Sequence, residues 1–254
     1  MKTILVFFAL IFAGIAYGDL PENDLYLQDN DFMFNNSLTE DEFNDTIDEV
    51  SKIYAPIVEN MGATLTIKGD WDDSTVNAWT KTDGKEWIIQ MFGGLARRKE
   101  ITKDGFKMVI CHEIAHHIGG YPNQDWAAIE GQADYVTTFV CAKKVFADTT
   151  VSINNYKWCD FYGTEKEKNV CNRSLDASQS LADLLASLSY GKKPDFETPD
   201  KTEVRKTSTY HPKAQCRLDT FLAGAVCDKK WDDKVIPKNA KATCDNRPKC
   251  WFYK

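Results

Sequence analysis

Two histidines and a glutamate in the order H-E-x-x-H have the spacing in this chain best suited to chemistry: His112, Glu113 and His116. In a helix, residues i and i+4 lie on the same face, so both imidazoles can reach one metal ion. Glu113 flanks that face, where a carboxylate can take a proton from a water that the metal activates. The chain has only four histidines, so a chance occurrence of this pattern is improbable.

A second pair of acidic residues follows, again four apart, at Glu130 and Asp134. A second helix would present Glu130 as a third ligand, and two histidines with one carboxylate leave a position open for water on a tetrahedral zinc ion. We therefore expect one Zn²⁺ per chain on His112, His116 and Glu130, with Glu113 as general base in the hydrolysis of a peptide bond. Asp134 is expected to orient a ligand histidine through its other ring nitrogen, the alternative being an ordinary surface charge.

Two neighbouring residues limit the alternatives. Gly119 follows His116 by three, as in the metzincin pattern, but Pro122 stands where that pattern needs a third histidine. The metzincin assignment is therefore rejected. His117 points about 100° away from His116 on a helix, which favours a packing or solvent-facing role.

The composition and the first residues indicate the compartment. The formal net charge of −7 argues against binding to nucleic acid or to an anionic membrane. Residues 1–18 have a positive charge at Lys2, an apolar run over Ile4–Ala16 and small residues at its end, as in a secretory signal peptide. We expect cleavage before Asp19 and export to the periplasm or the medium, an uncleaved anchor being the alternative. No later segment is long and apolar enough to span a bilayer.

All eight cysteines follow this signal, and an even number in an exported chain predicts disulfides. No C-x-x-C pair is present to favour a cysteine-bound second zinc ion. Six of the eight lie between residues 159 and 250, so we expect the C-terminal half to be the cross-linked half. Cys216 and Cys227 lie three turns apart on one expected helix and cannot pair, which leaves Cys244 and Cys250 as partners for some of the others.

A bridge between Cys111 and Cys141 is not expected. If the helices carrying His112 and Glu130 pack antiparallel with these two residues side by side, Cys141 lies about 16 Å along its helix from Glu130. That direction leads away from Cys111, whereas bridged Cα atoms must approach within about 7 Å. Either or both would then be buried free thiols.

The remaining pattern gives the expected elements. Thr39 and Glu42 form a capping box that opens an amphipathic helix over residues 40–60. Short strands are expected at 63–67, 75–80 and 86–92, the last two joined by a hairpin turn at Asp83-Gly84. Further helices are expected from Thr102 or Lys103 to Gly119, over 125–146 and 174–190, and from His211-Pro212 to about 227, with an irregular insertion at 147–172 and a polar loop at 192–209.

Four segments in order resemble the HtpX-type and CAAX-prenyl-protease-type gluzincin metallopeptidases, peptidase family M forty-eight. They are Asn77-Ala78 in a strand, Asp104 to His116, Glu130-Gly-Gln-Ala-Asp134, and Thr209-Tyr210-His211-Pro212 followed by Arg217-Leu218. The resemblance covers about residues 40–225, and the two metal motifs are its specific part. The spacing from His116 to Glu130 is shorter than is usual in that family, and Tyr210 interrupts its T-H-P segment.

The resemblance implies a zincin-like fold with the same zinc ligands and the same base. It also implies that a substrate peptide pairs with the sheet edge near Asn77 and Ala78. His211 then either assists on the oxyanion side or occupies the position of the water as an inhibitory latch. A histidine at a helix start with no role is the remaining alternative.

We therefore predict an α+β, zincin-like fold that is mainly helical, with a small and mostly antiparallel sheet beside the H-E-x-x-H helix and a disulfide-supported C-terminal part. The expected order is a signal peptide at 1–18, an extended lead-in at 19–38, a zinc metallopeptidase domain at 39–227 and a cysteine-containing tail at 228–254 packed on it. The expected function is an exported zinc endopeptidase acting on unfolded or extracytoplasmic proteins. The alternatives are a zinc-bound chaperone or scaffold latched by His211, and a hydrolase acting on a non-peptide amide.

Overall fold

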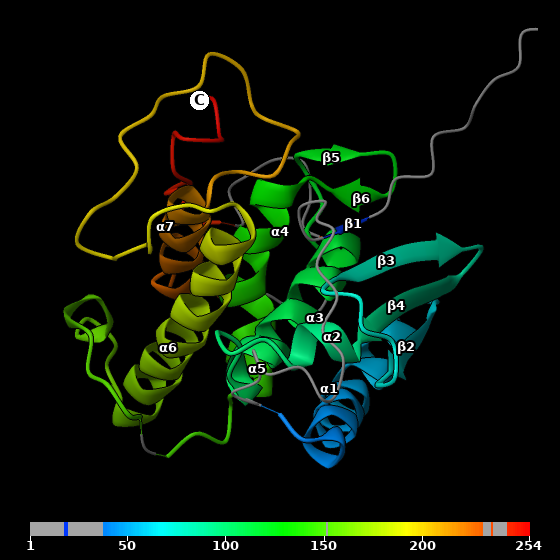
Figure 1. Ribbon diagram of the computed structural model, residues 1–254. Helices are drawn as coiled ribbons and strands as arrows, with labels where there is room; N and C mark the ends of the chain where they lie inside the picture. Colours follow the sequence, from blue (N-terminus) through cyan, green and yellow to red (C-terminus); the bar gives the residue numbers. More distant parts are fainter. Residues whose placement is uncertain (1–17, 20–37, 151, 231–234, 236–242) are drawn as a thin grey trace, which may run out of the picture.

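A computed structural model describes residues 18–19, 38–150, 152–230, 235 and 243–254 of the chain. The architecture is α+β, as predicted, with a helix at its centre, a small sheet on one side and further helices on the other (Figure 1). The expected signal peptide and lead-in lie outside the described residues, apart from 18–19 and 38. Among the residues that are described, no helix has both the length and the apolarity needed to cross a membrane.

Helix α1 (Glu40–Asn60) begins at the predicted capping box. The Thr39 hydroxyl accepts a bond from the backbone N–H of Glu42, and the Glu42 carboxylate accepts one from the backbone N–H of Thr39. The residues at helical spacing on its inner face are buried: Phe43, Ile47, Val50, Tyr54 and Val58. This face packs against the sheet and the central helix, so the amphipathic pattern predicted the burial correctly.

The main sheet has the order β1-β3-β4-β2. Strands β3 (Ala78–Asp83) and β4 (Glu86–Phe92) form the predicted antiparallel hairpin, and Gly84 in its turn has φ 61°, a left-handed conformation that favours glycine. Strand β2 (Thr64–Asp70) runs parallel to β4, whereas the other strand pairs are antiparallel, so the sheet is mostly antiparallel, as expected. The two-residue strand β1 (Gly18–Asp19) pairs antiparallel with β3 on its other edge.

Helix α3 (Lys103–Ile118) is the central element, and its limits are those predicted. The Thr102 side chain caps its start by accepting a bond from Gly105 N–H, and Gly119 ends it. Every residue from Gly105 to Ile118 is buried, because α1, the sheet, α4 and α6 surround the helix. Its histidines and glutamate are therefore held in the interior, where rotamers are fixed by packing.

The helix expected from residue 125 begins later, at Glu130. Strands β5 (Asn123–Gln124) and β6 (Ala127–Ala128) form a hairpin before it, and Asp125 in the turn has φ 48°, a conformation that ends helical continuity. The helical run that follows has three parts. They are α4 (Glu130–Val136), a π-helix (Thr137–Cys141) and α5 (Ala142–Val145).

Two later helices also differ from the predicted limits. Helix α6 (Glu165–Leu188) begins nine residues before the expected position, because Thr164 caps it through Glu167 N–H while its polar first turns conceal the periodicity. A 3₁₀ turn (Lys157–Cys159) lies within the insertion before it. Helix α7 (Ala214–Ala225) begins three residues after His211, which therefore lies in the preceding loop.

Four disulfides confirm the expectation from the cysteine count. The pairs are Cys111–Cys141, Cys159–Cys171, Cys216–Cys250 and Cys227–Cys244. Three of the four lie in the C-terminal half, as predicted. Cys216 of α7 and Cys227, two residues after its end, pair with the tail and not with each other, also as predicted. Disulfides of this number are typical of an oxidising compartment.

The bridge between Cys111 and Cys141, with Cα atoms 5.5 Å apart, contradicts the prediction that it would not form. The helices do run antiparallel, but the prediction placed the backbone of Glu130 level with the two metal-motif histidines. In the structure Gln132 donates a 2.7 Å bond to the Gly119 carbonyl, so the start of α4 lies beside the end of α3. Glu130 reaches back with its side chain, and Cys141 comes level with Cys111.

The described part of the C-terminal tail packs beneath α4 and α7. Trp251 is fully buried, its indole N–H donates to the Thr220 hydroxyl at 3.0 Å, and its ring lies against Gly131. Arg247 donates a 2.7 Å bond to the Gln132 side chain. The tail therefore supports the helix that begins with Glu130.

Candidate metal centre

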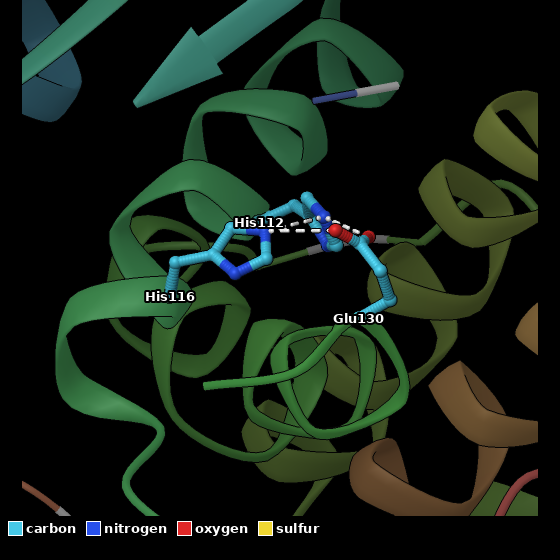
Figure 2. Close-up of side chains that lie close together, drawn as sticks. All are labelled: His112, His116 and Glu130. Atoms are coloured by element: carbon cyan, nitrogen blue, oxygen red, sulfur yellow. Dashed lines mark hydrogen bonds and ion pairs between the residues drawn. The ribbon is translucent and has the colours of Figure 1, made fainter. Parts of the chain in front are cut away.

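The side chains of His112 and His116 from α3 meet that of Glu130 from the first residue of α4 (Figure 2). The two histidine Nε2 atoms lie 3.1 Å apart. Oε2 of Glu130 lies 3.2 Å from Nε2 of His112, and Oε1 lies 3.6 Å from Nε2 of His116. All three side chains are buried, so the cluster is a convergent set of donor atoms that can hold a metal ion.

The orientation of His116 is fixed by the β5–β6 hairpin. Its Nδ1 lies 2.7 Å from the carbonyl oxygen of Ala128, which can only accept a hydrogen bond. Nδ1 therefore carries the proton, and Nε2 presents its lone pair to the cluster. Burial lowers the pKa of His116 to about 4, so the ring is neutral at pH 7, as a metal ligand must be.

The Asp134 carboxylate lies against the other ring nitrogen of His112. Nδ1 of His112 lies 3.0 Å from Oδ1 of Asp134. Burial lowers the pKa of His112, but the carboxylates of Asp134 and Glu130 outweigh it and raise the pKa to about 9. Without a metal the ring therefore carries a proton that a metal ion would displace from Nε2.

Arg217 compensates the charge of Asp134 on the other side. Its Nε donates a 2.8 Å hydrogen bond to Oδ2 of Asp134, and its Nη2 donates one of 2.8 Å to Oδ1. The guanidinium is fully buried. Nη2 also lies 3.9 Å from Oε2 of Glu130. Burial raises the pKa of Glu130, but the histidines His116 and His112 more than reverse this and lower it, so the carboxylate is ionised. The centre thus places two buried carboxylates against a buried guanidinium and two imidazoles.

Glu113, the predicted base, is fully buried on the same helix as both histidines. Burial lowers the pKa of Arg217, but the charges of Asp134 and Glu130, with a smaller contribution from Glu113, raise it, so the Glu113 carboxylate lies within electrostatic range of that guanidinium. Arg217 in turn contacts Asp134 and approaches Glu130. The structure therefore brings the predicted base to the same buried network as the candidate ligands.

His211 also reaches the cluster from the loop before α7. Its Nε2 lies 3.3 Å from Oε2 of Glu130, and about a third (31%) of its side chain is exposed. The donor atoms that lie within 4.8 Å of one another are those of His112, His116 and Glu130, and His211 is outside that set. In this arrangement His211 contacts a candidate ligand and is positioned above the centre, beside a cavity of about 220 Å³.

Asn77 and Ala78 lie at the start of β3, away from the donor cluster. Ala78 is buried and pairs with Met91 of β4, and the Asn77 side-chain oxygen accepts a bond from Ala78 N–H. On the other edge of β3, Gly18–Asp19 pairs antiparallel with the next two residues of the strand. The edge that the resemblance assigns to a substrate peptide is thus one on which an extended segment of this chain is seated.

His117 has the packing role that its direction on the helix favours. Its ring is stacked between Trp87 of β4, at 4.5 Å, and Trp126 of the β5–β6 turn, at 4.6 Å. Its Nε2 lies 2.7 Å from the Thr80 hydroxyl. This stack fixes the hairpin against the sheet, and so it fixes the Ala128 carbonyl that orients His116.

Two contributors were not found as functional groups from the residues themselves. Arg217 entered only through the family resemblance, and its distance of 83 residues from Asp134 gives no local signal. The Ala128 carbonyl is a backbone group that no residue pattern identifies. The buried arginine and the short hairpin before the E-x-x-x-D run come together with the site only when the chain folds.

No protein-family model matches the chain, and neither the curated proteins nor the solved structures compared with it give a match. The function therefore has to be inferred from the chemistry of the site.

Proposed function

We propose that the chain is an exported zinc-dependent endopeptidase that hydrolyses peptide bonds. The observation that carries the proposal is the convergence of His112, His116 and Glu130 on one buried point next to Glu113. A structural helix has no need of two buried histidines whose Nε2 atoms face each other at 3.1 Å. The family resemblance of the same residues favours the same reaction.

The spacing of the donor atoms supports zinc. In tetrahedral sites, Zn–N and Zn–O distances of about 2.0–2.2 Å place neighbouring ligand atoms about 3.3–3.6 Å apart. The two histidine Nε2 atoms lie 3.1 Å apart, and each lies near one carboxylate oxygen of Glu130, at 3.2 Å from Oε2 for His112 and 3.6 Å from Oε1 for His116. The donor set of two imidazoles and one carboxylate is also the set found in catalytic zinc sites that leave a fourth position open.

Zinc bound there would act as a Lewis acid that polarises a carbonyl and makes a water acidic near pH 7. His112 and His116 supply two neutral nitrogens, and Asp134 and the Ala128 carbonyl keep those rings in place. Glu113 takes a proton from the attacking water and delivers it to the leaving amine. Arg217 holds Asp134 in place through two hydrogen bonds, so the geometry is set before the substrate arrives.

The proposed substrates are unfolded or extracytoplasmic polypeptides. An extended segment already pairs with the outer edge of β3, which supports the addition of a substrate strand to this edge. The four disulfides favour an oxidising compartment, the periplasm or the medium.

A second candidate function is a protease-fold chaperone or scaffold that holds zinc in a latched state. The observation that favours it is the contact of His211 with Glu130 at 3.3 Å. A small movement of the loop before α7 would bring this imidazole to the fourth position of the metal. His211→Ala distinguishes the two, since it raises peptidase activity if His211 is a latch and lowers it if His211 assists the reaction.

The primary experiment compares the mature chain from Asp19 with its Glu113→Gln variant. Bound metal is quantified in both, and both are assayed on unfolded casein. We expect one zinc ion in each and cleavage by the unsubstituted chain alone. Zinc in both with cleavage by neither would favour the latched scaffold, and absence of metal in both would overturn the assignment of the centre.

A further inference from the structure

A second cavity, of about 380 Å³, lies where the π-helix, α5, the start of α6 and the end of α7 meet. Small-molecule sites occupy about 300–1,000 Å³, so this volume is sufficient for a ligand. None of the three candidate metal ligands lines the cavity. It is therefore separate from the candidate metal centre.

The floor of the cavity is apolar. Phe139 and Val140 of the π-helix form part of it, and Val170 of α6 and Ala225 of α7 complete it. All four side chains are buried by the protein. Single π-helical turns within α-helices are rare and occur frequently at functional sites, because the extra residue turns side chains toward a ligand.

The rim of the cavity is cationic. Five lysines line it and only two carboxylates oppose them, although the chain as a whole has a net charge of −7. The lysines are Lys143, Lys144, Lys166, Lys229 and Lys230, and the carboxylates are Glu167 and Asp228. A positive rim on an acidic protein favours an anionic ligand at this place.

Lys143 lies over the apolar floor. Its Nζ lies 5.5 Å from the ring centre of Phe139 and 5.7 Å from that of Tyr162, and it donates a hydrogen bond to the carbonyl of Cys227. Within the described part of the chain it forms no salt bridge. Burial lowers its pKa to about 8, against the charges of Asp228 and Glu167 at the rim. An ammonium group kept over an apolar floor, with no direct salt bridge to either carboxylate, is a suitable partner for the head of an anionic ligand.

The combination selects one class of ligand. A small hydrophilic anion would gain nothing from Phe139 and Val140, and a neutral hydrocarbon would gain nothing from Lys143. A nucleic acid needs an extended positive surface, whereas this chain is acidic. A molecule with one anionic head and a short apolar body uses both halves of the site.

We propose that this cavity binds a carboxylate amphiphile, with the carboxylate at Lys143 and the hydrocarbon chain over Phe139 and Val140. A medium-chain fatty acid is the simplest member of this class. The proposal does not depend on peptidase activity, since it rests on residues outside the metal centre.

Calorimetric titration of the zinc-loaded chain with hexanoate, octanoate and decanoate tests the proposal. We expect one saturable site whose affinity rises about fourfold for each methylene group buried, until the cavity is filled. Decanol lacks the head and phosphate lacks the tail, so both should bind at least tenfold more weakly than decanoate. No saturable binding of decanoate, or equal binding of decanol, would overturn the proposal.

Two variants assign the binding to this cavity. Lys143→Met should weaken decanoate binding by about tenfold or more, and Ala147→Trp should block it by filling the cavity from a half-buried position. Lys52→Met removes an exposed lysine of α1 and is the matched control, with unchanged affinity expected. Thermal unfolding and zinc content verify that each variant is folded. Decanoate affinity equal to that of the unsubstituted chain in both cavity variants would place binding elsewhere, the metal centre included, and would refute the site.

Discussion

Nδ1 of His112 lies 3.0 Å from Oδ1 of Asp134, and both side chains are buried. The same carboxylate accepts two 2.8 Å bonds from Arg217, so it is fixed from two sides. A movement of Asp134 would therefore turn the imidazole away from the point on which the donor atoms converge. This chain of contacts makes metal affinity depend on residues that do not touch the metal.

Replacing Asp134 by asparagine should weaken zinc binding with little change of shape. Loss of the carboxylate removes the partner that holds the proton on Nδ1 of His112, and such changes cost about 10–100-fold in metal affinity. Competition against a chelator of known affinity measures the effect. Asp183→Asn is the control, because that carboxylate forms a salt bridge with a mostly exposed partner, Lys193. Equal affinities of the two variants would contradict the orienting role.

Replacing Arg217 by methionine should destabilise the fold. The substitution keeps length and apolar contact but leaves Asp134 as an uncompensated charge in the interior, which costs about 3–5 kcal/mol. Urea unfolding of metal-free protein gives the free energy of unfolding. The double variant Arg217→Met/Asp134→Asn should recover part of the loss. Additive effects of the two substitutions would show that the two side chains are not coupled.

The metal-free protein should lose stability as the pH rises from 6.5 to 9. The carboxylates of Asp134 and Glu130, acting against burial, raise the pKa of His112 from 6.5 to about 9. A group whose pKa is higher in the folded state than in the unfolded state stabilises the fold when it is protonated. For His112 this stabilisation is complete below pH 6.5 and is lost as the pH rises through about 9. This loss amounts to about 3 kcal/mol.

Urea unfolding at several pH values, in the presence of a chelator, measures this slope for the unsubstituted chain and for His112→Gln. The comparison is needed because burial lowers the pKa of Lys143 to about 8, which makes stability rise with pH between 8 and 10.5. The difference between the two chains isolates His112. A difference that stays constant from pH 6 to pH 9.5 would show that this imidazole does not gain its proton on folding.

Local spacing predicted the parts of the site that lie within one or two turns. The capping residue Thr102 and the terminating Gly119 gave the limits of α3, and the i, i+4 rule placed His112 and His116 on one face. The structure also places Asp134 against His112, where the second motif predicted it. The limits of α3 and the shared face of its two histidines depend on contacts between residues close in sequence, which is where sequence patterns carry physical information.

The alignment of helices distant in sequence was not predictable in the same way. Whether Cys141 meets Cys111 depends on how far α4 slides along α3, and a shift of two turns decides between a bridge and two free thiols. Arg217 meets Asp134 through the packing of α7 on α4, which no local pattern encodes. How far one helix lies along another is determined by the packing of all the side chains between them, and no short sequence motif encodes it.

Peptide mapping of the unreduced protein should find the four pairs of the structure. The Cys111–Cys141 pair should be the last to be reduced, because both sulfur-bearing side chains are fully buried in the core. Removing it in the double variant Cys111→Ala/Cys141→Ala should cost about 2–4 kcal/mol of unfolding free energy. Free thiols at these two positions in the untreated protein would restore the prediction made from sequence.

Replacing Gly131 by alanine should destabilise the protein, although alanine normally favours a helix. A Cβ atom at this position would lie 2.2 Å from the ring of Trp251, which is fully buried and hydrogen-bonded to Thr220. Either the ring or the start of α4 must shift, at a cost of about 1–3 kcal/mol, and a shift of α4 moves the adjacent Glu130. We expect reduced unfolding free energy and weaker zinc binding, measured by urea unfolding and chelator competition.

Gly163→Ala provides the control for this substitution. A Cβ atom at Gly163 has no neighbour within 4 Å, so the change should leave stability and zinc affinity unaltered within about 0.5 kcal/mol. The contrast tests whether the C-terminal tail supports the metal centre through Trp251. If Gly131→Ala behaved like Gly163→Ala, the tail would be able to yield without disturbing α4. Weaker zinc binding at Gly131→Ala alone would show that the position of Glu130 depends on the packing of Trp251, which is 121 positions further along the chain.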